Sequence, residues 1–153
     1  MIKKIVSGGQ TGVDRAGLDA AIQHNIPHGG WCPRERHAED GRIDDKYQLT
    51  ETASHDYAIR TEYNVRDSDG TLILNLGKLE GGTAYTAHVA EYMHKPCLII
   101  DISLSPDPEE VLDWVKNNKI QTLNIAGPRE SKSPGIYSLA RSEIDRILYS
   151  LQK

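Results

Sequence analysis

Cysteine is scarce in this chain. Cys32 and Cys97 are the only two among 153 residues, and they do not form a C-x-x-C pair. A disulfide framework needs more cysteines, and a structural zinc site needs closely spaced cysteine or histidine ligands, which the six scattered histidines do not supply. The composition argues against both, and it predicts a cytoplasmic protein without a metal site.

Long apolar runs and an excess of positive charge are also missing. The longest apolar cluster, at residues 97–100, is far shorter than a membrane span, and the run at 2–6 is too short for a secretion signal. Lys and Arg number 18 against 22 Asp and Glu, whereas proteins that bind nucleic acid by charge are usually basic. The sequence therefore predicts no membrane or nucleic-acid partner, and its length predicts one domain over residues 1–153.

Short apolar runs alternate with segments of helical period along the chain. This alternation, repeated about five times, predicts an α/β fold with a mostly parallel sheet of about five strands flanked by helices. Residues 31–54 lack a sustained period, and a loop of that length is usually functional or mobile. Strands are expected at residues 2–6, 27–30, 71–76, 97–102 and 121–126, and helices at 13–23, 57–67 and 83–94, after Asp107-Pro108 and after Ser133-Pro134.

Three expected strand-to-helix turns are rich in glycine or hydroxyl residues. Helix N-termini expose unpaired N–H groups, and right-handed crossovers bring the turns to one sheet edge, so together they could cradle an anionic or nucleotide-like ligand. Each turn alone could equally be a plain connection, and the first lacks the G-K-[ST] ending of a P-loop. The turns are Ser7-Gly8-Gly9-Gln10-Thr11-Gly12 with the following Val13-Asp14-Arg15, then Gly81-Gly82-Thr83, and Gly127-Pro128-Arg129-Glu130-Ser131.

Charged residues in or beside these turns are candidates for binding or catalysis. Arg129 and Arg34 are interpreted as phosphate ligands because a guanidinium matches phosphate oxygens, whereas Arg36 is interpreted as a solvated surface charge. Asp14 either caps its helix or acts in catalysis. Glu130 either acts as a general base or bridges to Arg129.

Several longer motifs carry a resemblance to a known family. They are the first and third turns, the Gly81-Gly82-Thr83 turn, Cys32-Pro33-Arg34, Ala38-Glu39-Asp40-Gly41, and Asn64-Val65-Arg66-Asp67-Ser68-Asp69-Gly70-Thr71. Taken in their order along the chain, and over nearly its whole length, they resemble the family named "putative molybdenum carrier", also described as a circularly permuted relative of YpsA. The resemblance implies a Rossmann-like three-layer sandwich, in a group that includes the LOG enzymes, the DprA group and the molybdenum cofactor carriers.

The resemblance implies two alternative functions. A carrier would bind molybdenum cofactor (molybdopterin), a phosphate-bearing pterin, in a glycine-rich cleft at the C-terminal edge of the sheet. A LOG-like phosphoribohydrolase would instead cleave an N-glycosidic bond in a nucleotide. The LOG motif P-G-G-x-G-T-x-x-E is incomplete in Gly81-Gly82-Thr83-Ala84-Tyr85-Thr86, so Asp14 or Glu130 would have to act in catalysis.

The leading interpretation is therefore a binder of a small anionic ligand, a nucleotide or pterin phosphate. A homo-oligomer is also expected, with part of the apolar stripe of the last helix between subunits. The residues assigned to the ligand are Gly8, Gly9, Gln10, Thr11, Gly12, Asp14, Arg15, Arg34, Gly81, Gly82, Thr83, Gly127, Arg129, Glu130 and Ser131.

Overall fold

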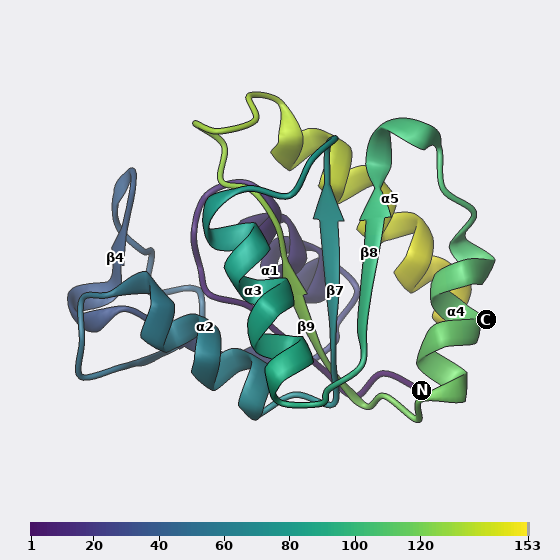
Figure 1. Ribbon diagram of the computed structural model, residues 1–153, viewed down its shortest axis with the longest axis horizontal. Helices are drawn as coiled ribbons and strands as arrows, with labels where there is room; N and C mark the ends of the chain where they lie inside the picture. The colour runs from purple at the N-terminus through teal and green to yellow at the C-terminus, as the bar shows by residue number, and fades with distance from the viewer. Residues whose placement is uncertain (153) are drawn as a thin grey trace.

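A five-stranded parallel sheet forms the centre of the computed structural model, which describes residues 1–152. The strand order is β2-β1-β9-β7-β8, so the last strand of the chain lies in the middle of the sheet (Figure 1). Register pairs Ile5 of β1 with Leu123 of β9, and Ile73 of β7 with Ala126 of β9. The strands are β1 (Lys4–Val6), β2 (His28–Gly29), β7 (Gly70–Asn75), β8 (Cys97–Asp101) and β9 (Thr122–Ala126).

Helices cover both faces of this sheet. Helices α1, α4 and α5 lie on one face, where α5 packs on α1 and α4, and helices α2 and α3 pack together on the other (Figure 1). The α/β, Rossmann-like three-layer fold with a parallel sheet of five strands is confirmed. The helices are α1 (Val13–Gln23), α2 (Tyr57–Arg66), α3 (Gly81–Tyr92), α4 (Pro108–Asn117) and α5 (Ile136–Leu151).

The main core lies between the sheet and the layer of α1, α4 and α5. All six residues of β7 are buried, as expected for a central parallel strand covered on both faces. The apolar stripe of α5 packs into this core, with Ile136, Ala140, Ile144 and Ile147 almost completely buried. These residues pack inside their own chain, whereas Leu139 of the same stripe is 48% exposed, so an interface between subunits over part of the stripe stays a prediction.

The segment between β2 and α2 folds into short paired pieces that its aperiodic sequence did not predict. Strand β3 (Trp31–Cys32) pairs with β6 (Thr50–Glu51), and β4 (His37–Ala38) with β5 (Gly41–Arg42) forms a small antiparallel hairpin that projects from the body (Figure 1). The single-turn 3-10 helix Arg34–Arg36 connects them.

Arg36 organises this segment, and its interpretation as a solvated charge is wrong. The residue is 8% exposed. Its Nε donates to the carbonyl of Ile43 at 3.0 Å, and Nη2 donates to the carbonyls of Asp44 and Tyr47 at 2.7 and 2.9 Å. One buried guanidinium thus satisfies carbonyl groups that no sheet or helix reaches, which explains how an irregular segment can pack.

The final helix begins at Ile136, two residues after Pro134, the residue expected to open it. Gly135 has φ 90° and ψ −4°, a left-handed conformation that separates Ser133-Pro134 from the helix beginning at Ile136. The N-terminus of α4 matches its sequence signal, since the Asp107 carboxylate accepts from the Glu109 amide at 3.0 Å and Pro108 is the first helical residue.

The strand order also determines where a ligand could lie. The crossover from β1 through α1 passes on one face of the sheet, and the crossover from β7 through α3 passes on the other. Helices α1 and α3 therefore begin on either side of the carboxyl end of β9. In open α/β sheets such a change of crossover face leaves a crevice at the strand ends.

Candidate functional site

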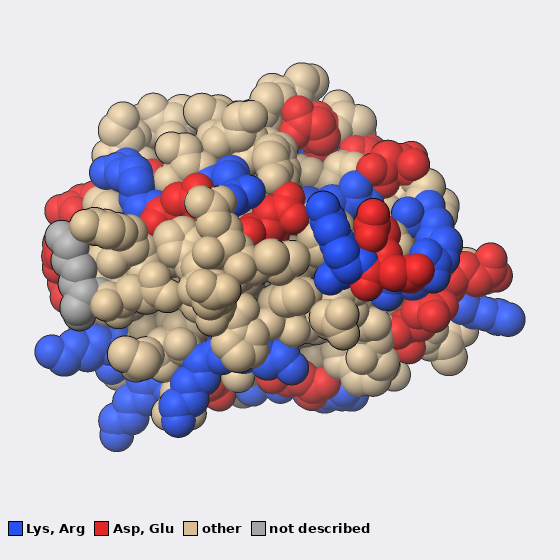
Figure 2. Space-filling model, turned by 180° about the vertical axis from the view of Figure 1, so that it is seen from behind, with Lys and Arg blue, Asp and Glu red and all other residues tan. Residues whose placement is uncertain are grey.

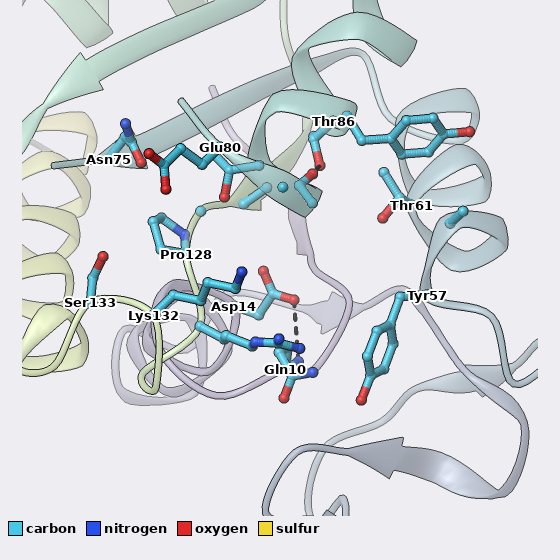
Figure 3. A pocket seen from close by; sticks show the side chains of 18 of the residues that line it. Gln10, Asp14, Tyr57, Thr61, Asn75, Glu80, Thr86, Pro128, Lys132 and Ser133 are labelled. Atoms are coloured by element: carbon cyan, nitrogen blue, oxygen red, sulfur yellow. Dashed lines mark hydrogen bonds between the residues drawn. The ribbon is translucent and has the colours of Figure 1, made fainter. Parts of the chain in front are cut away.

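A cavity of about 530 Å³ occupies this crevice. All three glycine-bearing turns contribute to it, and helix α2 supplies a further wall (Figure 3). From the expected ligand set, its lining contains Gln10, Asp14, Gly81, Gly82, Thr83, Gly127 and Arg129.

The first and third turns touch directly, and Gly12 makes this possible. Gly12 has φ 79° and ψ −128°, and a Cβ at this position would lie 2.4 Å from the carbonyl oxygen of Pro128. The Pro128 carbonyl accepts a hydrogen bond from the Val13 amide at 3.3 Å, and the Thr11 hydroxyl accepts one from the Glu130 amide at 3.1 Å. Gly12 is therefore needed for the close approach of the two turns.

Asp14 forms part of the cavity floor together with Arg60 of α2. The Asp14 carboxylate accepts from the Gln10 amide at 3.2 Å and from Nη1 of Arg60 at 3.3 Å, and its side chain is 4% exposed. Burial raises the pKa of Asp14 above its ordinary value, although the charge of Arg60 and the Gln10 amide oppose the shift. Gly8 leaves the space for this pair, because its Cβ would overlap the Arg60 guanidinium.

The N-terminus of α3 is open to the cavity. Its N-cap residue, Glu80, makes no side-chain capping hydrogen bond. A Cβ on Gly82 would meet nothing within 4 Å, and one on Gly81 would meet only the ammonium of Lys132, at 3.9 Å. A ligand can thus approach the first backbone amides of α3 closely, and an anion there would meet both the positive end of the helix dipole and Lys132.

The charge of the cavity is opposite in sign to that of the whole chain. Its lining contains four cationic side chains, Arg60, Lys78, Arg129 and Lys132, against the two carboxylates of Asp14 and Glu80, while the chain carries a net charge of −4. The face formed by α1, α4 and α5 shows blue and red groups interspersed (Figure 2). The lining thus carries more positive than negative side chains, which favours an anionic occupant.

Two buried guanidinium nitrogens in this lining have no hydrogen-bond partner in the part of the chain that the structure describes. They are Nε of Arg60 and Nε of Arg129. A buried donor without an acceptor costs roughly 1–3 kcal/mol. For Arg129 part of this cost is offset by the Glu39 carboxylate, which lies 3.5 Å from its Nε.

Other members of the expected ligand set have roles outside the cavity lining. Both Glu130 carboxylate oxygens cap α5, accepting from the amides of Gly135 at 2.6 Å and Tyr137 at 3.0 Å. This geometry does not place Glu130 as a general base at the cavity. Arg34 is exposed in the 3-10 turn, also away from the cavity.

The remaining members support the turns or meet carboxylates of the β4–β5 hairpin. Gly8, Gly9 and Gly12 provide space for neighbouring side chains or backbone. Arg15 holds Asp40 through two hydrogen bonds of 2.5 and 2.8 Å, and the hydroxyls of Thr11 and Ser131 donate to Glu39.

Sequence reasoning missed the wall from α2 and the basic residues beside the turns. Tyr57, Arg60 and Thr61 lie on a helix that has no glycine motif, so nothing local marked them. Lys78 and Lys132 each lie within a few residues of a predicted turn, and this proximity was an available signal. Figure 3 shows Lys132 among the side chains that line the cavity, together with Asp14.

Comparison with known proteins identifies the relatives of this chain. A family model described as the circularly permutated YpsA SLOG family matches residues 5–148. The chain belongs to this family. Among solved structures, one of a protein named "Putative molybdenum carrier protein" from Syntrophus aciditrophicus SB is 50% identical, covers 96% of this chain and 95% of its own, and superposes with a TM-score of 0.91. No curated protein matches the chain.

The family resemblance noted in the sequence is thereby confirmed, and the fold of this YpsA SLOG member is that of its solved relative. Within residues 1–152, no helix has the length and apolar character needed to span a membrane. The same residues contain no group of three His, Cys, Asp or Glu side chains placed to hold a metal ion.

Proposed function

We propose that this protein binds a small phosphorylated molecule, a nucleotide- or pterin-like ligand, in the cavity at the carboxyl edge of the sheet. The single observation that carries the proposal is the meeting of three glycine-bearing turns around one cavity with four cationic side chains in its lining. A phosphate at the N-terminus of α3 would receive backbone amides and the Lys132 ammonium.

Molybdenum cofactor is the pterin ligand that the solved relative's name suggests, and here it would be cargo. The lining fits such a molecule in two respects. Arg60, Arg129 and Lys132 bring cationic donors to the lining, and phosphate oxygens are strong acceptors. The hydroxyls of Tyr57, Thr61 and Thr86 on the opposite wall offer partners for the polar edge of a ring.

Equilibrium titration tests the proposal. The purified protein is titrated by calorimetry with molybdopterin cofactor, prepared without oxygen, and separately with AMP and GMP. We expect saturable binding of at least one of them, about tenfold weaker in Lys132→Ala because a charge-assisted contact is lost. Lys116→Ala on α4, outside the cavity lining, is the matched control and should leave the affinity unchanged. Absence of saturable binding to all three ligands by the folded protein would refute the proposal.

Phosphoribohydrolase activity is a second candidate, favoured by one observation. Asp14 is a buried carboxyl in the cavity lining whose pKa is raised by burial, and such groups are suited to general acid–base chemistry. The assay is release of free base from AMP and GMP. For a hydrolase, Asp14→Asn should abolish release while nucleotide binding persists; no release by the unchanged protein would eliminate this candidate.

A further inference from the structure

The hairpin tip between β4 and β5 makes contacts that the proposed function does not use. Its Glu39 carboxylate reaches the third turn, where it accepts from the Ser131 amide at 3.2 Å and lies 3.5 Å from Nε of Arg129. It also accepts from the hydroxyls of Thr11 and Ser131. One carboxylate therefore bridges the first and third turns.

This carboxylate is held in its charged form. The Glu39 side chain is 19% exposed. Burial alone would raise the pKa of Glu39, but hydrogen bonds from Ser131 and Thr11 and the charge of Arg129 outweigh it and leave the pKa below its ordinary value. An ionised carboxylate thus faces the Arg129 guanidinium at neutral pH.

Arg129 lies between Glu39 and the cavity. Its side chain is 36% exposed and lines the cavity, while its buried Nε donates no hydrogen bond. A guanidinium carries five N–H donors in a fixed plane, so contact along one edge determines the direction of the others. Glu39 therefore restricts the orientation in which Arg129 faces the cavity.

The same hairpin also holds Gln10, which lines the cavity. The Gln10 side-chain carbonyl accepts from the Glu39 amide at 2.9 Å and from the Thr11 amide at 3.0 Å. The backbone and the side chain of Glu39 thus each fix one residue of the lining, on two different turns.

We propose that Glu39 is a positioning residue that orients Arg129 toward a phosphate of the bound ligand. This inference rests on the proposed function. Pre-orientation lowers the entropy lost when the arginine engages the ligand, so the intact Glu39–Arg129 contact strengthens binding. If Glu39 instead competed with the ligand for Arg129, its removal would strengthen binding. The test below distinguishes the two roles.

The test compares two neighbouring carboxylates of the hairpin tip. Glu39→Gln removes the charge beside Arg129, and Asp40→Asn, the matched control, removes the partner of Arg15, which does not line the cavity. Titrated with molybdopterin cofactor, AMP and GMP, Glu39→Gln should bind about tenfold more weakly, while Asp40→Asn stays within about twofold of the unchanged protein. In an Arg129→Ala background, Glu39→Gln should have no further effect.

A spectroscopic measurement tests the contact without a ligand. In the ¹⁵N-labelled protein, the Nε–Hε signal of Arg129, assigned as the one lost in Arg129→Lys, should shift in Glu39→Gln, stay in place in Asp40→Asn, and return toward its original position in Glu39→Asp. A signal unmoved by Glu39→Gln would show that Glu39 does not orient this guanidinium.

Four binding outcomes overturn the inference. If Glu39→Gln bound as tightly as the unchanged protein, or if Asp40→Asn lost as much affinity as Glu39→Gln, Glu39 would have no specific role. Tighter binding in Glu39→Gln would identify the carboxylate as a competitor. Failure of all three probes to bind the unchanged protein would refute the proposed function and this inference together, whereas the first three results leave the proposed function standing.

Discussion

Replacing Gly12 by alanine should lower stability by an amount that the geometry of the first turn determines. Gly12 has φ 79° and ψ −128°, a region that residues with a side chain rarely adopt, and forcing alanine there costs about 2 kcal/mol. The new Cβ would also lie 2.4 Å from the Pro128 carbonyl oxygen and 2.9 Å from the Glu130 amide, and overlap with backbone costs about 2 kcal/mol more.

The two contributions together are about 4 kcal/mol, a large part of the 5–15 kcal/mol that typically stabilises a domain. Urea unfolding followed by circular dichroism measures the change. With a slope near 2 kcal/mol per molar, the midpoint should fall by about 2 M.

Gly82→Ala is the matched control for this experiment. Gly82 lies in the first turn of α3, its Cβ would meet nothing within 4 Å, and its φ is not in the left-handed range. Its urea midpoint should equal or slightly exceed that of the unchanged protein, because alanine favours the helix. If Gly12→Ala unfolded at the same urea concentration as Gly82→Ala, the direct contact between the first and third turns would be refuted.

Three further predictions concern residues around the cavity and the long segment. Glu130→Ala should lower the free energy of unfolding by about 1 kcal/mol, measured in urea, through loss of the α5 cap, and should leave ligand affinity within about twofold, measured by calorimetry. Arg36→Lys should lower Tm by about 4–8 °C in a calorimetric scan, because an ammonium has its three donors on one nitrogen and cannot reach the separate carbonyls that Nε and Nη2 contact, at a cost of about 2 kcal/mol. Burial raises the pKa of Asp14, so the contribution of its protonated form to folding stability is present at low pH and is lost as pH rises through the folded-state pKa. The stability of the unchanged protein relative to Asp14→Asn should therefore fall as pH increases above 3.8, the ordinary pKa of the group. Urea unfolding of both proteins at several pH values measures this difference.

The sequence predicted the main elements well because their signals are local. Helix α1 has the expected bounds, since its apolar period begins directly after a glycine turn. Strands β7 and β9 follow from short apolar runs whose length excludes helices. The late start of α5 was missed because the αL conformation of Gly135 depends on how the third turn packs.

The site was only partly predictable, for a physical reason. The handedness of the crossovers alone predicts that the three turns lie at the same edge of the sheet. The position of Arg60 depends on where α2 packs, and the burial of Arg36 depends on carbonyls up to 13 residues away. Charge and residue type do not distinguish a solvated arginine from one that organises a loop, so tertiary contacts are needed to tell them apart.

The central position of β9 has a consequence for biosynthesis. On the ribosome, β1 emerges with its neighbour β2 close behind, yet β9, its neighbour on the other side, is made more than 110 residues later. Until β9 inserts between β1 and β7, the nascent chain lacks the strand that joins its two halves, and the carboxyl-edge crevice has no third turn. Pairing between such distant segments is slow. Competence for the proposed ligand binding should therefore arise abruptly once β9 and the third turn have been made, and chains truncated before residue 126 should be substrates for chaperones and proteases.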